Sequence, residues 1–276
     1  MNTSKGFLPL TAGVVLVSVL AGVGTGVCAW GAEQDARALR RLFADPPREY
    51  ASAPLWVWND LLTPGQVQDT MRDLAGQGVQ QVFVHPRPGL MTPYLGEDWF
   101  ELWRAALREA GRLDMNVWIY DENSYPSGFA GGLVPEAMPE SRGMGVSVEA
   151  VKPGSVRDAD VLSLYRVEGG EVREITSETG LGQPLPTGEG VLAARVLRAG
   201  NSPWHGDRSY VNLLTAGVTE KFLEITLGAY DAQVKDAYGK RIPGVFTDEP
   251  NIRPAGGLPW CPDLPQQFET RWGTRW

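Results

Sequence analysis

Two pairs of acidic side chains follow apolar segments of this chain, each where a β-strand is expected to end. Asp121 and Glu122 close the segment "NVWIYDE", and Asp248 and Glu249 follow the apolar part of "IPGVFTDEP". Loops after strands are a common place for chemistry, because a rigid sheet aims them. Two carboxyl groups across a gap can act as acid and base in the hydrolysis of a glycosidic bond. Acidic side chains can also supply oxygen ligands to a divalent cation.

Two earlier apolar segments also end in hydrogen-bonding side chains. "LWVWND" ends in Asn59 and Asp60, and "VFVHPR" ends in His85 and Arg87. Four polar strand ends in succession are typical of the face of a (β/α)₈ barrel on which active sites are built. An open doubly wound sheet places ligands at the same ends of its strands. However, no G-x-G-x-x-G and no P-loop lysine motif is present, so nucleotide binding lacks its usual sequence support.

The segments between these strand ends predict the elements that position them. Strands are expected at residues 54–58, 79–85, 116–120 and 242–247, with amphipathic helices between them, one of them capped by Asp98. This alternation predicts a parallel sheet. From residue 144 to 197, short alternating runs separated by Gly and Pro predict an antiparallel insertion between the third and fourth strands. The expected fold class is α/β of the (β/α)₈ TIM-barrel type, with about the first four βα units present.

The beginning of the chain predicts export. Lys5 precedes an apolar stretch from Phe7 to Val27, and small residues near Ala29 resemble a cleavage site, which is typical of a secretory signal peptide. A secreted or periplasmic protein is therefore expected. An uncleaved membrane anchor is the alternative, because the apolar run approaches the ~20 residues that span a bilayer. The expected parts are a signal peptide at 1–32, half-barrel units at 33–134, a β-rich insertion at 135–208, and a helix with the fourth strand at 209–276.

The composition of the chain limits the kinds of partner that we expect. The chain has 276 residues, of which 43% are hydrophobic and 21% charged, values ordinary for a folded protein. Its net charge is -8 and no cluster of Lys and Arg stands out, so neither nucleic acid nor an anionic membrane surface is expected as a partner. Cys28 and Cys261 are the two cysteines, and Cys28 lies within the expected signal peptide. They give neither an internal disulfide in the processed chain nor a metal motif.

Several sequence blocks carry a resemblance to a known family. "LWVWNDLLT", "VFVHPRPGLMTPYLGEDWF", "WIYDENSYPSGFAGGLV", "YVNLL" and "IPGVFTDEP" lie between Phe43 and Trp260. They resemble successive blocks of the catalytic barrel of the α-L-rhamnosidase-like glycoside hydrolases of family 106, found in secreted bacterial polysaccharide degraders. The resemblance implies a (β/α)₈ barrel in a longer multidomain chain, an inverting mechanism that uses two glutamates, and a Ca²⁺ ion near the site. Asn212 in "YVNLL" departs from the pattern, which leads us to expect Asp there.

The resemblance also suggests roles for the strand-end residues. Glu249 becomes the candidate catalytic acid, in a setting to which Phe246 and Trp260 are expected to contribute. The candidate substrate-binding residues are Asn59, His85, Arg87, Asp121, Glu122 and Asp248. The expected activity is hydrolysis of α-L-rhamnosyl or related bonds in an oligo- or polysaccharide. The second glutamate is expected from the missing half of the barrel, which is therefore an expected partner.

Two other functions remain open from the sequence. One is a catalytically inactive carbohydrate-binding fragment. The other is a metal-assisted hydrolase on a TIM barrel, in which four side chains would hold a divalent ion: Asp121, Glu122, Asp248 and Glu249.

Overall fold

The computed structural model describes residues 35–274. The chain divides into two units, Met1–Ala51 and Ser52–Trp276. In the first unit, the described residues form a helix over 35–44 and a 3₁₀ turn, η1 (Arg48–Tyr50). The expected signal peptide at 1–32 lies outside the described residues. Within residues 35–274, no helix combines the length and apolar character needed to cross a membrane.

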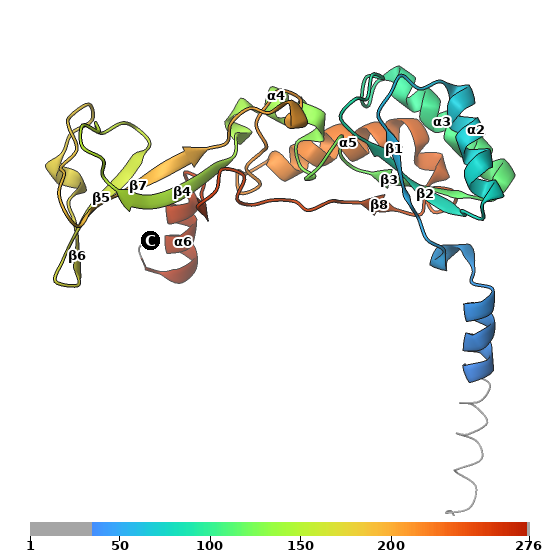
Figure 1. Cartoon of the computed structure of the whole chain (residues 1–276), viewed down its shortest axis with the longest axis horizontal. Helices are drawn as coiled ribbons and strands as arrows, with labels where there is room; N and C mark the ends of the chain where they lie inside the picture. Colours follow the sequence, from blue (N-terminus) through green and yellow to red (C-terminus); the bar gives the residue numbers. More distant parts are fainter. Residues whose placement is uncertain (1–34, 275–276) are drawn as a thin grey trace, which may run out of the picture. The chain divides into compact units, whose positions relative to one another are not determined.

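The second unit contains a parallel sheet of four strands (Figure 1). Its spatial order follows the chain order, β1-β2-β3-β8, with each neighbouring pair parallel. The carboxyl ends of the strands therefore lie along one edge, as the sequence predicts. The strands are β1 (Leu55–Trp58), β2 (Gln81–Pro86), β3 (Asn116–Tyr120) and β8 (Val245–Phe246).

Strand β8 is shorter than the expected 242–247. Pro243 has no backbone N–H and cannot donate to a sheet ladder. Gly244 still accepts a hydrogen bond from Ile119 N at 3.2 Å. A Cβ at Gly244 would lie 2.8 Å from the Trp118 ring, so the chain passes too close to that ring for a larger residue.

Three helices cover one face of this sheet: α2 (Pro64–Gly76), α3 (Glu97–Leu113) and α5 (Val218–Val234). A capping box starts α2, because the Thr63 and Gln66 side chains each accept a hydrogen bond from the other residue's backbone N–H. The expected cap of α3 is wrong. This helix begins at Glu97, so Asp98 lies inside its first turn rather than at the N-cap, where its charge suits the helix dipole.

The main core lies between the parallel sheet and these helices. Its strand residues include Val84 and Ile119, and its helix residues include Trp99, Trp103 and Tyr230, all fully buried. The opposite face of the sheet is partly open. It carries Leu55, Val57 and Phe246, which are 50%, 45% and 37% exposed.

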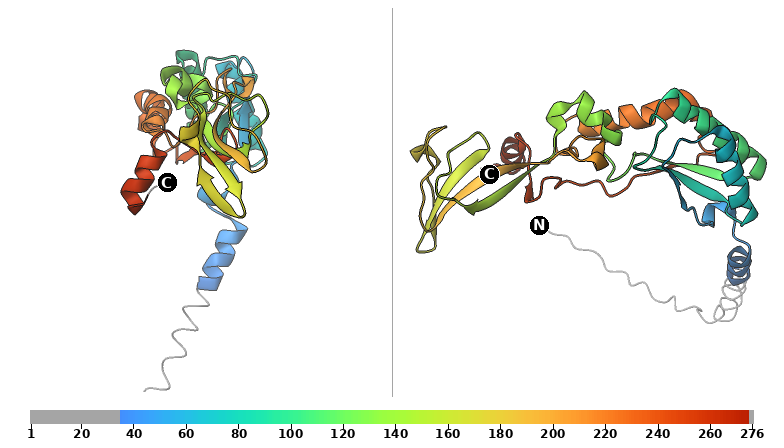
Figure 2. Two further views of the ribbon diagram at one scale, coloured as in Figure 1. Left: turned by 90° about the vertical axis from the view of Figure 1, so that its left-hand side faces the viewer. Right: turned by 45° about the horizontal axis from the view of Figure 1, so that its top comes forward.

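An antiparallel sheet is formed mainly by residues 144–198, between β3 and β8 in the chain, as expected. Its order is β6-β5-β7-β4-β9, and Figure 2 shows its strands as one twisted sheet. The pairing of β9 with β4 was not expected. It requires Gly145, where a Cβ would lie 2.0 Å from Gly256 O. The strands are β4 (Met144–Ala150), β5 (Val161–Glu168), β6 (Glu171–Glu174), β7 (Val191–Arg198) and β9 (Leu258–Pro259).

Short helices lie in the connections between these elements, and α6 follows the last strand. They are η2 (Ala130–Gly132), α4 (Leu133–Ala137), η3 (Pro139–Ser141), η4 (Thr176–Glu178), η5 (Pro203–His205), η6 (Lys235–Ala237) and α6 (Leu264–Trp272). The described chain is thus a mixed α/β fold with one parallel and one antiparallel sheet, which confirms this level of the expected fold class.

Candidate functional site

The loop that follows β3 is folded around one carboxylate. Glu122 has 0% exposure, and its two oxygens accept hydrogen bonds from five backbone N–H groups. The donors are Asn123 (2.8 Å) and Gly131 (2.5 Å) on Oε1, with Gly128 (3.0 Å), Phe129 (2.9 Å) and Ala130 (2.8 Å) on Oε2. The side chain predicted to bind substrate therefore organises residues 123–131.

The charge state of Glu122 follows from these donors. Burial raises the pKa of its carboxyl to about 8, and the backbone hydrogen bonds limit this rise. The geometry nevertheless favours the ionised form. Five donors occupy the lone pairs of both oxygens, and an added proton would face an N–H group instead of an acceptor. We therefore assign the ionised form, because a buried carboxylate is stable when its oxygens are fully hydrogen-bonded.

Asp121 joins the same loop to the residues after β8. It is 2% exposed, and its two oxygens accept from the hydroxyls of Ser127 and Thr247, both at 2.6 Å. Ser127 also bonds Asp248 twice: its Oγ accepts from Asp248 N at 2.8 Å, and its N donates to Asp248 O at 2.7 Å. Burial raises the pKa of Asp121, and the two hydroxyls oppose this change. Asp121 thus holds the ends of β3 and β8 together.

A second set of contacts crosses three strand ends. Asp248 Oδ2 accepts from the Tyr120 hydroxyl at 2.5 Å, and the Tyr120 ring meets the His85 ring edge-on, with centroids 3.8 Å apart. His85 Nε2 lies 2.9 Å from Arg87 Nη1. Since a guanidinium can only donate, Nε2 accepts and the His85 proton is on Nδ1. Burial lowers the pKa of His85 to about 4, and the positive charge of Arg87 acts in the same direction.

Arg87 lies between two aromatic rings. Its guanidinium carbon is 5.1 Å from the ring centroid of Tyr125 and 5.3 Å from that of Trp204. Trp204 belongs to η5, which follows the antiparallel sheet, and its Nε1 donates to Tyr125 O at 2.5 Å. Arg87 and Trp204 border a small pocket of about 80 Å³, lined also by Asn123, Ser124, Gly131 and Gly206.

The sequence analysis did not select Trp204. Its turn is held close to the β3 loop by Gly206, where φ is 63° and a Cβ would lie 2.3 Å from Gly131 O. This approach is open to glycine alone, since an L side chain would overlap that carbonyl. A tryptophan inside the Ser-, Pro- and Gly-containing turn "NSPWHG" is the sequence feature that could have pointed to this position.

The remaining predicted residues, Glu249 and Asn59, lie apart from these contacts. Glu249 is exposed and has a positive φ of 44°, which is uncommon for a residue with a side chain. Within residues 35–274, neither side chain has a hydrogen bond or ion pair. Trp260 does not contribute to the setting of Glu249 as expected, because it packs with Met144, Val146 and Ala194 of the antiparallel sheet.

Asn212, the position that departs from the family pattern, is fully buried. Its Nδ2 donates to Trp260 O at 2.8 Å, and its Oδ1 accepts from Leu214 N at 3.2 Å. An ionised Asp could not make the first of these bonds, because it has no donor. The amide therefore connects two segments of the chain.

The acidic strand ends do not fit the expected divalent ion. The oxygens of Asp121 and Glu122 are engaged by hydroxyl and backbone donors, and Asp248 binds Tyr120. Over residues 35–274, no three His, Cys, Asp or Glu side chains converge as a set of metal ligands. We therefore assign no residue of this part of the chain to Ca²⁺.

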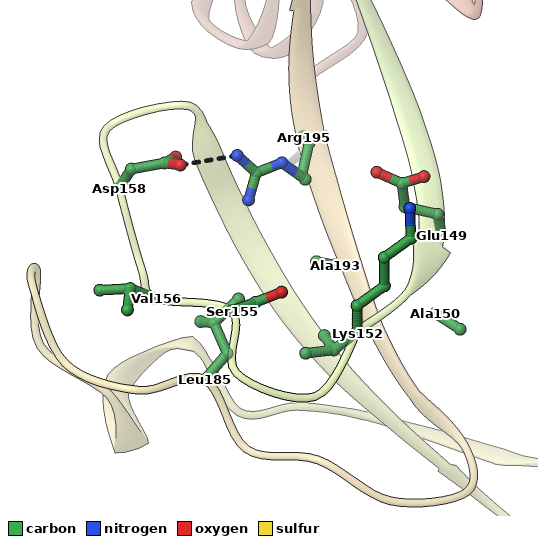
Figure 3. Close-up of a pocket in the computed structure, with 10 residues that line it drawn as sticks. Glu149, Ala150, Lys152, Ser155, Val156, Asp158, Leu185, Ala193 and Arg195 are labelled. Carbon is green, nitrogen blue, oxygen red and sulfur yellow. Dashed lines mark hydrogen bonds and ion pairs between the residues drawn. The ribbon is translucent and has the colours of Figure 1, made fainter.

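A larger pocket, of about 330 Å³, lies on the antiparallel sheet and contains none of the predicted site residues (Figure 3). Arg195 in this pocket pairs with Asp158 at 2.7 Å, so its charge is compensated there.

Comparison with known proteins gives a likeness of fold. No protein-family model matches this chain, and no curated protein matches it in sequence. The solved structure of a rhamnosidase from Novosphingobium sp. PP1Y aligns with 86% of this chain at a TM-score of 0.53 and 14% sequence identity. At this identity the likeness concerns the fold alone: the fold of this chain resembles part of that rhamnosidase. The chain spans 42% of the length of that rhamnosidase.

Proposed function

We propose that this chain forms part of the (β/α)₈ barrel of a secreted glycoside hydrolase related to the α-L-rhamnosidases of family 106. The observation that carries the proposal is the row of polar strand ends, where Asp248, Tyr120, His85 and Arg87 are in contact across β8, β3 and β2. The fold of the rhamnosidase supports it, as do the sequence blocks that contain these residues. The substrate would be an oligo- or polysaccharide with an α-L-rhamnosyl or related bond.

In the proposed reaction, Glu249 protonates the leaving oxygen. It is the acid at these strand ends whose carboxylate is exposed and has no partner within residues 35–274. Inversion requires a second carboxylate about 6.5 to 9.5 Å away, with room for the attacking water. Asp121 and Glu122 are unsuitable, because their oxygens already accept hydrogen bonds. The base would therefore come from outside the four described strands, in a segment that completes the barrel.

Sugar hydroxyls would be bound by the other polar groups at these strand ends. Asp248 is held by Tyr120, which leaves its second oxygen as an acceptor, and Asn59 is exposed at the end of β1. His85 would act mainly through Arg87, whose position it fixes.

One observation favours a second candidate, a carbohydrate-binding function without hydrolysis. Three of the four acidic side chains at these strand ends have structural contacts, so the described residues offer Glu249 alone as a carboxylate that is both exposed and without a partner. One carboxylate can bind a sugar hydroxyl but cannot supply both acid and base.

The proposal is tested by release of 4-nitrophenol from 4-nitrophenyl α-L-rhamnoside, measured on the protein that contains both this chain and the segment that completes the barrel. We expect turnover that falls by about a hundredfold or more in Glu249→Gln, the usual size of a general-acid contribution. Glu189→Gln is the matched control, since Glu189 is an exposed acid in a loop of the antiparallel sheet. Calorimetric titration with L-rhamnose distinguishes the alternatives: binding without turnover favours the second candidate, and neither binding nor turnover contradicts both.

A further inference from the structure

Arg87 is a half-buried cation without an acidic partner. Among residues 35–274 it forms no ion pair, and its hydrogen-bond partner is the neutral His85 ring. Arg195 differs in this respect, because it pairs with Asp158 at 2.7 Å. A guanidinium has five N–H groups, so Arg87 retains several donors and a full positive charge for a ligand.

The surroundings of Arg87 fix the plane of its guanidinium. The rings of Tyr125 and Trp204 contact it at 5.1 and 5.3 Å, and cation–π contacts of this kind stabilise the cation without neutralising it. His85 holds Nη1 from a third direction. A fixed, planar and unpaired guanidinium is suited to a planar anion, which it can bind through two parallel N–H···O bonds.

A second polar group in the same pocket also lacks a partner. Ser124 is 1% exposed and lines the pocket beside Arg87, and its hydroxyl makes no hydrogen bond in the described chain. A buried hydroxyl without a partner is costly, which suggests that a ligand supplies one. An oxygen acceptor in this pocket would satisfy both Ser124 and Arg87. The exposed face of Trp204 offers a surface on which a sugar ring can stack.

We propose that Arg87, Ser124, Tyr125 and Trp204 form a carboxylate-binding subsite, and that the saccharide substrate carries a uronic acid there. This inference rests on the proposed function for its sugar part, and on Arg87 and Ser124 for its carboxylate part. The arginine of the pocket in Figure 3 offers no equivalent site, because Arg195 is paired with Asp158 there.

The test is a calorimetric titration of the full chain with two sugars that differ at C6 alone. Methyl β-D-glucopyranosiduronate carries the carboxylate, and methyl β-D-glucopyranoside is its neutral counterpart. We expect the uronate to bind at least tenfold more tightly, the size of effect expected for a charge-assisted bidentate contact. In Arg87→Gln this preference should disappear, while binding of the neutral sugar changes less than twofold.

Two further variants make the result specific. Arg195→Gln removes a paired arginine from the other sheet and should leave the preference unchanged. Arg87→Lys keeps the charge but loses the planar donors, and should retain only part of the preference for the uronate. It replaces Arg87→Gln as the test variant if circular dichroism shows that Arg87→Gln does not fold.

Several outcomes would overturn the subsite. Equal affinity for the two sugars removes the carboxylate preference but leaves a carbohydrate-binding function intact. If Arg87→Gln still prefers the uronate, another residue binds the carboxylate. Equally tight binding of glucose 6-sulfate shows a site for anions in general. Binding of neither sugar by the folded chain contradicts the subsite, and failure of L-rhamnose to bind in the separate titration would be needed to reject the proposed function as well.

Discussion

Replacing Glu122 with glutamine is expected to lower the free energy of unfolding by about 3 to 5 kcal/mol. The carboxylate accepts five backbone N–H groups in a site with 0% exposure. An amide has one oxygen, and its NH₂ group can only donate. Whichever way the amide is turned, its NH₂ faces at least two N–H donors, because Oε1 has two and Oε2 has three. Those donors would be left buried and unsatisfied.

Glu249→Gln is the matched control for this prediction. The substitution is the same, but the Glu249 side chain is exposed and has no hydrogen bond or ion pair within residues 35–274. Its effect on stability should stay within about 0.5 kcal/mol. Urea unfolding at neutral pH, followed by tryptophan fluorescence, measures both variants. Similar unfolding midpoints for Glu122→Gln and the wild type would contradict the structural role of Glu122.

This role links stability to the candidate site. The loop that Glu122 organises carries Ser124 and Tyr125, and its Gly131 contacts Gly206 in the turn of Trp204. Loss of the carboxylate should therefore disturb both rings around Arg87. Glu122 would act on a ligand by positioning other groups, because its own oxygens are occupied.

The sequence was informative where hydrophobic periodicity and the residues that end each segment decide the structure. The apolar run before Asp121 predicted β3 with its observed bounds, and alternating runs between residues 144 and 197 predicted antiparallel strands. The polar strand ends followed from the same reading, since parallel strands place their carboxyl ends together. Boundaries were less accurate where one residue decides them, as Pro243 does for β8.

The structural roles of the acidic side chains could not be predicted from the sequence. Five donors reach Glu122 because residues 123–131 fold back on it, and no periodicity records such a turn. Trp204 reaches Arg87 from a segment more than a hundred residues later in the chain, through a close approach that depends on Gly206. Both contacts depend on tertiary structure. The catalytic role of Glu249 and the substrate-binding roles stay predictions.

Acidification is expected to destabilise the protein through His85. Its pKa is about 4 in the folded chain, compared with 6.5 for an unperturbed histidine. As the pH falls below 6.5, the unfolded chain takes up a proton here, whereas the folded chain does not until about pH 4. The unfolded state then binds more protons, so stability falls with pH. Between about pH 7.5 and about pH 4.5, this group should remove about 2 to 3 kcal/mol.

The structural cause of this loss is the Arg87 contact. Protonation would place a second positive charge 2.9 Å from Arg87 Nη1 and would remove the lone pair that Nε2 uses as an acceptor. The raised pKa of Asp121 has the opposite effect, because protonation of a carboxyl with a raised pKa favours the folded state as the pH falls. Urea unfolding across this pH range in the wild type and in His85→Asn separates the two, since Asp121 is common to both proteins. The wild type should lose about 2 to 3 kcal/mol more than the variant. Parallel curves would show that His85 titrates normally in the folded chain, and that its contact with Arg87 does not depend on a neutral ring.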